Sequence, residues 1–253
     1  MASSDRIAIV TGTSSGIGRA LADILLRGGW AVIGVARRVP DLTHPAYRHL
    51  TLDLTDLAAT TAAFERDIAP MLHDRAVERV GLVNNAAVIG RAATIETTVA
   101  ESLLATYAVN VVAPTWLVGF VLRHARRDCA VRIVNVSSGA AMHASPGMGE
   151  YSGTKAALRM MSMAAAADLA SEPLAGRGPS DVAVLSYAPG TVDTAMQAAA
   201  RAQPAETFPS AAMFHGFHDQ GKLVPPAAPA AEIAAFLNSA HPPRFAERRL
   251  GDA

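Results

Sequence analysis

Tyr151 and Lys155 have the residue types and the spacing for acid–base chemistry at an oxygen atom. They are four positions apart in a stretch with helical spacing, so both side chains are expected on one face of a helix. A free phenol has a pKa of about 10 and exchanges its proton reluctantly at neutral pH. A nearby ammonium group favours the phenolate and lowers that pKa. The pair therefore indicates a proton donor for a developing alkoxide, although alone Tyr151 could be a packed aromatic residue and Lys155 a solvated charge.

A second candidate site is a glycine-rich segment that joins a short β-branched run to a helical stretch. Glycines at such a junction let the backbone turn sharply and approach a pyrophosphate, which the N-terminus of the helix then stabilises. A glycine turn without a ligand is the alternative. We expect a dinucleotide phosphate site formed by Gly12, Ser14, Ser15, Gly16, Ile17 and Gly18.

The end of the second apolar run indicates which dinucleotide is used. An enzyme that uses NAD would place Asp or Glu there, to bind the ribose 2′-hydroxyl. Here the position is Ala36, and Arg37 and Arg38 follow it. Two guanidinium groups suit a 2′-phosphate, which predicts NADP (NADPH) as the cofactor. Two solvated surface arginines are the alternative.

Apolar runs that alternate with helical stretches must position these residues. Because the apolar runs are continuous, both faces of the sheet are expected to be covered by helices. The pattern predicts an α/β fold with a single doubly wound parallel sheet, in one NADP-binding domain over residues 1–253. The expected strands are 6–11, 30–35, 49–52, 80–83, 131–136 and 182–186, and the expected helices are 16–26, 56–73, 101–127 and 154–169.

The regularity ends after Gly190. Residues 191–229 contain five prolines and three phenylalanines, Phe208, Phe214 and Phe217. A long irregular segment inside a compact domain is usually a functional loop, so we predict a substrate lid at about 191–223. A plain surface excursion is the alternative.

Composition excludes several classes of protein. The 22 basic and 22 acidic residues balance, which argues against a nucleic-acid surface or a binder of acidic membranes. The longest apolar stretch, 109–122, is shorter than the roughly 20 residues of a membrane span, and no secretory signal precedes it. The single cysteine, Cys129, is expected to be a buried inert thiol. The histidines show no metal-binding spacing beyond the weak pair His215-x-x-His218, so no metal is predicted. We expect a soluble, cytoplasmic protein.

Taken together, these motifs resemble the short-chain dehydrogenase/reductase family, from Arg6 to about Met196. The resemblance rests on Thr11-Gly-x-x-x-Gly-x-Gly18, Asp53-Leu54, Asn84-Asn-Ala86, Asn110, Ser138, Tyr151-x-x-x-Lys155 and Pro189-Gly190. It implies a Rossmann fold whose cofactor contacts extend to Asp53, Leu54, Asn85, Ala86, Tyr151, Lys155, Pro189, Gly190, Val192 and Thr194. One departure is Ala87, where the family usually has glycine. It costs backbone strain only if its φ is positive.

The resemblance also assigns catalytic roles. It selects Ser138 over Ser137, because Ser138 lies thirteen residues before Tyr151, and it gives that hydroxyl the task of holding the substrate carbonyl oxygen. Asn110 is implied as a member of the proton relay. The family's common dimer would pack the helices at about 101–127 and 152–170 against their copies, so a homodimer is expected, with a tetramer as an alternative.

A narrower resemblance is to the branch of sepiapterin and benzil reductases, through Tyr187–Met196 and Gly221–Val224. It implies an NADPH-dependent carbonyl reductase acting on a ketone or a 1,2-dicarbonyl compound. The C-terminal tail does not match the acidic tail of sepiapterin reductases, so a ketone fits better than a pterin. The alternatives are an NADP-dependent alcohol dehydrogenase acting oxidatively and a non-catalytic NADP-binding regulator. The pocket is expected to include the segment 191–222 and Ala141, Met142, His143 and Met148.

Overall fold

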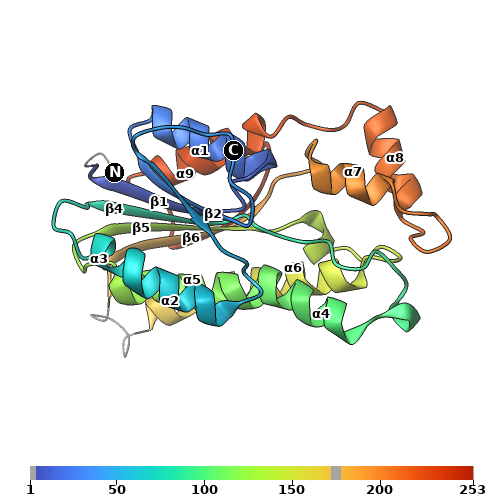
Figure 1. The fold of residues 1–253 in the computed structure, drawn as a ribbon, viewed down its shortest axis with the longest axis horizontal. Coiled ribbons are helices and arrows are strands. Elements are labelled where there is room, and N and C mark those ends of the chain that lie inside the picture. The colour runs from blue at the N-terminus through green and yellow to red at the C-terminus, as the bar shows by residue number, and fades with distance from the viewer. Residues whose placement is uncertain (1–3, 172–177, 253) are drawn as a thin grey trace.

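The computed structural model, which describes residues 4–171 and 178–252, is built around a parallel sheet with the strand order β3-β2-β1-β4-β5-β6-β7 (Figure 1). Every neighbouring pair of strands runs parallel. The predicted doubly wound α/β fold is therefore confirmed. The strands are β1 (Arg6–Thr11), β2 (Ala31–Ala36), β3 (Tyr47–Thr51), β4 (Arg79–Asn84), β5 (Ala130–Val136), β6 (Asp181–Ala188) and β7 (Phe245–Arg249).

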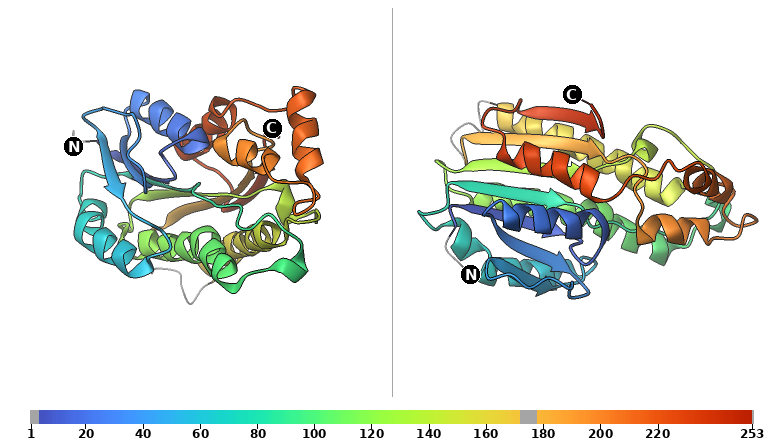
Figure 2. Two further views of the ribbon diagram at one scale, coloured as in Figure 1. Left: turned by 45° about the vertical axis from the view of Figure 1, so that its right-hand side comes forward. Right: turned by 90° about the horizontal axis from the view of Figure 1, so that it is seen from above.

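Helices cover both faces of this sheet, as Figures 1 and 2 show. On β1, Ile7 and Ile9 point into the core on one side of the sheet, whereas Ala8 and Val10 point into the core on the other side. Both sets are buried, which explains why the strand is a continuous apolar run. One face carries α1 (Gly16–Arg27) and α9 (Ala227–Asn238), and the other carries α2 (Leu57–Asp67), α3 (Ala69–Leu72), α4 (Ala100–Tyr107), α5 (Ala113–His124) and α6 (Gly149–Ala170).

Two of the expected helices are interrupted, and the one expected at 154–169 begins earlier, at Gly149. The stretch 56–73 is divided at Ile68 into α2 and α3, because Pro70 cannot donate the backbone hydrogen bond that a continuous helix needs at that point. The long stretch 101–127 contains a π-turn, η2 (Ala108–Val112), between α4 and α5. The second of these helices, α5, ends at His124.

By length and composition, the helix Ala100–His124 is the one candidate membrane span among the described residues. Its buried side chains, including Leu117, Phe120 and Val121, belong to the core beneath the sheet. This is the packing expected of a core helix in an α/β domain.

The end of the chain contains elements that the sequence analysis missed. β7 pairs with β6 at the edge of the sheet, although it contains Glu247, Arg248 and Arg249. Charged residues are common on edge strands, because such residues prevent further pairing. The segment predicted to be irregular contains α7 (Ala195–Arg201) and α8 (Ala211–Asp219).

The order of the strands determines where a ligand can bind. The chain builds the sheet outward from β1 to β3 and then returns to place β4 on the other side of β1. At such a reversal the connections leave on opposite faces and open a crevice at the carboxyl ends of the strands. The glycine-rich segment follows β1, Asn85 follows β4 and Ser138 lies just after β5, so three predicted motifs meet at this edge.

Candidate active site

A cleft of about 710 Å³ lies at the carboxyl edge of the sheet and brings nearly all of the predicted site residues together. Two of them, Gly18 and Asn110, are absent from its lining. The predicted residues that line it are Gly12, Ser14, Ser15, Gly16, Ile17, Arg37, Arg38, Asp53, Leu54, Asn85, Ala86, Ser138, Tyr151, Lys155, Pro189, Gly190, Val192 and Thr194.

The glycine-rich segment has the geometry of an anion site. Gly12 has a φ of +76°, which favours glycine, and a Cβ on Gly18 would lie 2.4 Å from the Gly12 carbonyl oxygen, so both positions need glycine. α1 begins at Gly16 with no side-chain cap from Ser15 and no acidic residue in its first turn. The positive end of this helix therefore faces the cleft without a protein partner, and the residues present fit a pyrophosphate.

A cationic edge lies at the end of β2. Arg37 and Arg38 follow Ala36, and Arg37 Nη1 lies 3.8 Å from Asp53 Oδ2. Hydrogen bonds from the backbone and the hydroxyl of Thr55 lower the pKa of Asp53, and the Arg37 charge adds a smaller effect in the same direction. A charged Asp53 and an exposed Arg37 are thus available at this end of the cleft.

The segment after β4 is fixed to the glycine-rich segment. Asn85 Nδ2 donates to the Thr11 carbonyl oxygen at 2.8 Å, and Thr11 Oγ1 accepts from the backbone N–H groups of Asn85 and Ala86 at 3.0 and 2.9 Å. No non-glycine residue in the described ranges has a positive φ, so Ala87 is free of left-handed strain. The departure from the family's glycine is therefore accommodated by the backbone.

Tyr151 and Lys155 both line the cleft from the first two turns of α6. Lys155 Nζ donates to the Val136 carbonyl oxygen at 2.8 Å, and burial lowers the pKa of this lysine to about 8. Burial also raises the pKa of Tyr151, which a hydrogen bond with the Ser138 hydroxyl lowers to a smaller extent. The expectation of a lowered tyrosine pKa is therefore wrong for the protein alone, because loss of hydration outweighs the effects that favour the phenolate.

Ser138 is placed to act as a donor. It caps the short 3₁₀ helix η3 (Gly139–Ala141), and its Oγ accepts from the Ala140 backbone N–H at 3.1 Å. A hydroxyl that accepts this bond still has its own proton to donate. That proton can go to the Tyr151 oxygen or to a substrate carbonyl.

Asn110 does not line the cleft but supports it through hydrogen bonds. It is fully buried in the π-turn η2, where Oδ1 accepts from the Val88 backbone N–H at 2.9 Å. Nδ2 donates to the Val88 carbonyl oxygen at 2.8 Å and to Thr154 Oγ1 at 3.0 Å. Both amide protons are used, so the side chain has none left to donate. The proton-relay role of Asn110 stays a prediction.

The lid predicted at 191–223 is a folded unit. Two backbone hydrogen bonds close its ends, from Asp193 N–H to the Val224 oxygen at 2.9 Å and from Val224 N–H to the Thr191 oxygen at 3.0 Å. Its residues Ala200, Phe208 and Ala211 form a small core together with Met148, which lies just before α6.

The three phenylalanines of the lid have different positions. Phe214 lines the cleft, Phe208 is completely buried in the small core, and Phe217 packs edge-on against Phe214 outside the lining. Of the expected covering residues, only Phe214 faces the cleft.

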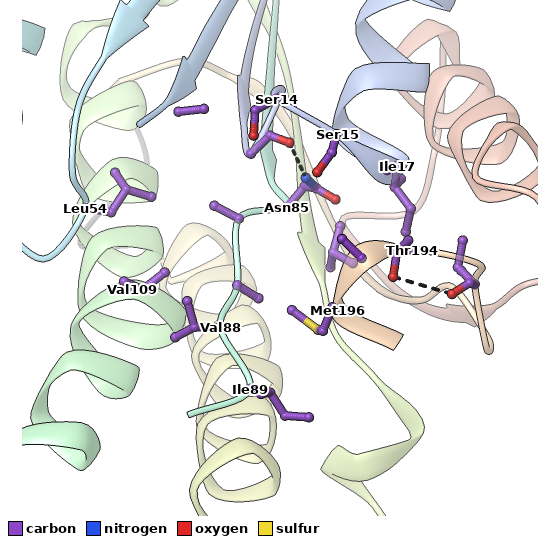
Figure 3. A pocket seen from close by; sticks show the side chains of 18 of the residues that line it. Ser14, Ser15, Ile17, Leu54, Asn85, Val88, Ile89, Val109, Thr194 and Met196 are labelled. Atoms are coloured by element: carbon purple, nitrogen blue, oxygen red, sulfur yellow. Dashed lines mark hydrogen bonds between the residues drawn. The ribbon is translucent and has the colours of Figure 1, made fainter. Parts of the chain in front are cut away.

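The substrate end of the cleft differs from the expected one. Ala141, Met142, His143 and Met148 do not line it. Val88 and Ile89 line it, and the sequence analysis did not select them. Met196 and Gln197 also line it, and both belong to the segment 191–222 that was expected in the pocket. Figure 3 shows Ile89 at the end of the pocket opposite Ser14, with Met196 on the neighbouring wall. The available signal was that Val88 and Ile89 follow the Asn-Asn-Ala motif with only Ala87 between.

No group of three or more histidine, cysteine or acidic side chains suited to a metal ion occurs in residues 4–171 and 178–252.

The family model for short chain dehydrogenases matches residues 6–205. A benzil reductase ((S)-benzoin forming) from Bacillus cereus is 31% identical over 92% of this chain and 94% of its own length. The enzyme of the same name from Bacillus subtilis (strain 168) is 29% identical over 86% of this chain and 87% of its own. The solved structure of the KRED1-Pglu enzyme is 25% identical, with a TM-score of 0.76 over 93% of this chain and 96% of that chain.

Proposed function

The chain belongs to the short-chain dehydrogenase family, and we propose that it is an NADPH-dependent carbonyl reductase acting on a ketone or on one carbonyl of a 1,2-dicarbonyl compound. The observation that carries this proposal is the presence of Ser138, Tyr151 and Lys155 in the same cleft as the uncapped N-terminus of α1. One part of the cleft suits a pyrophosphate, and another offers a proton donor beside a hydroxyl. Reduction of a carbonyl needs both.

The bound dinucleotide would supply the hydride. Tyr151 is neutral at pH 7, because burial raises its pKa, so it can donate its proton to the oxygen that becomes the alcohol. Ser138 holds that oxygen through its free hydroxyl proton. Lys155 remains an ammonium below a pKa of about 8 and stabilises the phenolate left on Tyr151.

The substrate class follows from the side chains near Tyr151. Ile89, Met196 and Phe214 line the cleft there. Arg37 and Arg38 follow β2, and Asp53 follows β3. An apolar wall with few polar groups favours a neutral and partly aromatic substrate. The two similar benzil reductases act, by their names, on a dicarbonyl compound of this kind.

The choice of NADPH rests on Arg37 and Arg38. Ala36 leaves the end of β2 without a carboxylate for a ribose 2′-hydroxyl, and guanidinium groups match a 2′-phosphate.

A cytoplasmic location is supported by Cys129, the one cysteine of the chain. It is buried, and burial raises the pKa of its thiol to about 11, so it is an inert thiol.

The test is the oxidation of NADPH, followed with benzil, butane-2,3-dione, simple aromatic and aliphatic ketones, and sepiapterin, with NADH in parallel. We expect turnover of the dicarbonyls with NADPH and little with NADH. Turnover only of alcohols with NADP⁺ would favour an oxidative dehydrogenase. Tight NADPH binding without turnover of any substrate would favour a regulator.

A further inference from the structure

Glu150, the residue before Tyr151, is a buried carboxylate to which the proposed chemistry gives no task. It is 7% exposed and lies in the first turn of α6. No basic side chain forms an ion pair with it in the described part of the chain. A buried charge without a cation must be stabilised by other donors.

Those donors come from two other elements. Glu150 Oε2 accepts from Ser102 Oγ at 2.9 Å and from Thr106 Oγ1 at 3.2 Å, both on α4, and from the Arg91 backbone N–H at 3.1 Å. The positive end of α6 adds a favourable field for the carboxylate. One oxygen atom thus ties α4 and the segment after β4 to the start of the helix that carries Tyr151.

Gly90 shows how closely the chain approaches this carboxylate. It has a φ of +72°, and a Cβ there would lie 2.4 Å from Glu150 Oε2 and 2.6 Å from Thr106 Oγ1. Glycine is therefore required both by the backbone conformation and by the space that the Glu150 side chain occupies.

The segment 88–91 is held at both ends. Asn110 binds the backbone of Val88, and Glu150 binds the backbone of Arg91. Ile89, between them, lines the cleft and lies at its substrate end in Figure 3. Ile89, Tyr151 and Phe214 also pack against the same small core of the lid, so the position of Ile89 sets the space available beside Tyr151.

We infer that Glu150 is a positioning residue that fixes Ile89 relative to Tyr151 and thereby sets the width of the substrate site for bulky aromatic dicarbonyls. This inference rests on the proposed carbonyl reductase activity. Loss of the carboxylate charge weakens the hydrogen bond to Arg91 and releases the wall that Ile89 forms. A small substrate does not need that wall, whereas a two-ring substrate does.

The first experiment compares Glu150→Gln with the wild type in the reduction of benzil and butane-2,3-dione by NADPH. We expect the ratio of KM for benzil to KM for butane-2,3-dione to rise by roughly tenfold, the size that corresponds to one charge-assisted hydrogen bond. The Kd of NADPH and kcat for butane-2,3-dione are expected to stay within about twofold, the scale of a mutational change below 0.5 kcal/mol. Glu101→Gln, an exposed carboxylate on α4, is the matched control. An unchanged KM ratio in Glu150→Gln overturns the inference.

A double-mutant cycle tests the contact itself. Gly90→Ala places a methyl group against the carboxylate, and in either background it also meets Thr106 Oγ1 and a positive φ. Its effect on the KM ratio is therefore expected to be smaller, but not absent, in Glu150→Ala, where the contact with the carboxylate is gone. Equal effects in both backgrounds would contradict a direct contact. If Glu150→Gln fails to fold, Ser102→Ala removes one donor and leaves the charge. A smaller shift in the same direction is expected, and no shift overturns the inference.

Hydrogen–deuterium exchange provides a readout that does not depend on turnover. In Glu150→Gln the peptide containing Arg91 is expected to exchange faster, while a peptide from α1 stays unchanged. If the wild type reduces no dicarbonyl, the proposed function is wrong, and the exchange result still decides whether Glu150 holds the segment. If the wild type is active and neither exchange nor the KM ratio changes, only the positioning role is wrong.

Discussion

The Lys155 ammonium nitrogen lies 5.6 Å from the centre of the Tyr151 ring, on the same face of α6. It is held there by the Val136 carbonyl oxygen at the end of β5. The helix supplies the spacing of the two side chains, and the sheet anchors the charge.

Tyr151→Phe is expected to lower kcat for dicarbonyl reduction by about 10²- to 10⁴-fold, the usual contribution of a positioned general acid. The ring keeps its packing against the small core of the lid, so the Kd of NADPH, measured by fluorescence, is expected to stay close to that of the wild type. Tyr107→Phe, on α4 and outside the cleft lining, is the control. A kcat near the wild-type value in Tyr151→Phe would remove this residue from the mechanism.

The pH dependence of kcat/KM is expected to report Lys155. Burial lowers the pKa of this lysine to about 8, so the ammonium is present below that pH and lost above it. Burial raises the pKa of Tyr151, so the phenol keeps its proton through the same range. We therefore expect kcat/KM for reduction to be level below pH 8 and to fall above it.

Lys155→Arg provides the comparison for the pH profile, because a guanidinium keeps its charge up to a pH of about 12. The fall above pH 8 is expected to disappear in this variant, even if its overall rate is lower. A fall at the same pH in both proteins would assign the titration to another group.

Arg37→Ala tests the cofactor preference. If Arg37 pairs with a 2′-phosphate, its loss is expected to weaken NADPH binding by about tenfold and NADH binding by less than twofold. The tenfold figure is the effect of losing one charge-assisted hydrogen bond, reduced because the side chain is exposed to solvent. Arg27→Ala, an exposed arginine at the opposite end of α1, is the control. Equal weakening of both cofactors would point to a contact that both cofactors make.

Phe214→Ala is expected to raise KM for benzil more than KM for butane-2,3-dione, because only the larger substrate extends to the lid. Phe217→Ala is the matched control, since Phe217 packs against Phe214 without lining the cleft. Limited proteolysis gives a second measurement: cleavage within 197–223 is expected to slow when NADPH is added, because Thr194, which caps α7, lines the cofactor cleft. Unchanged cleavage and an unchanged substrate preference would show that the lid is only a surface segment.

A homodimer is proposed through the outer faces of α5 and α6. Met160 and Met161 are 57% and 38% exposed there, and Met161 lines an apolar groove of about 670 Å³ between the two helices. Sedimentation is expected to give twice the 26.3 kDa of one chain, and Met161→Asp is expected to give monomers. Met142→Asp, an exposed methionine outside this groove, is the control. A wild-type monomer at micromolar concentration would rule out the dimer.

The sequence by itself determined the class of fold and most of the cleft. Continuous apolar runs such as Ile7–Val10 can be stable only where both faces of a strand are covered, which requires helices on each side of a parallel sheet. The glycine-rich segment, Ser138, Tyr151 and Lys155 were also identifiable, because each is a local pattern at the end of a strand or on one face of a helix.

Only the tertiary structure decided what depends on contacts between distant segments. Phe208 and Phe214 look equivalent in the sequence, but packing buries one in the small core and turns the other toward the cleft. β7 has no apolar pattern, because its position at the edge of the sheet demands little burial. The tyrosine pKa is raised because burial, which no local spacing reveals, removes water from the phenol. Glu150, an ordinary acidic residue in the sequence, becomes a tie between three segments because the fold places Ser102, Thr106 and Arg91 around one oxygen atom.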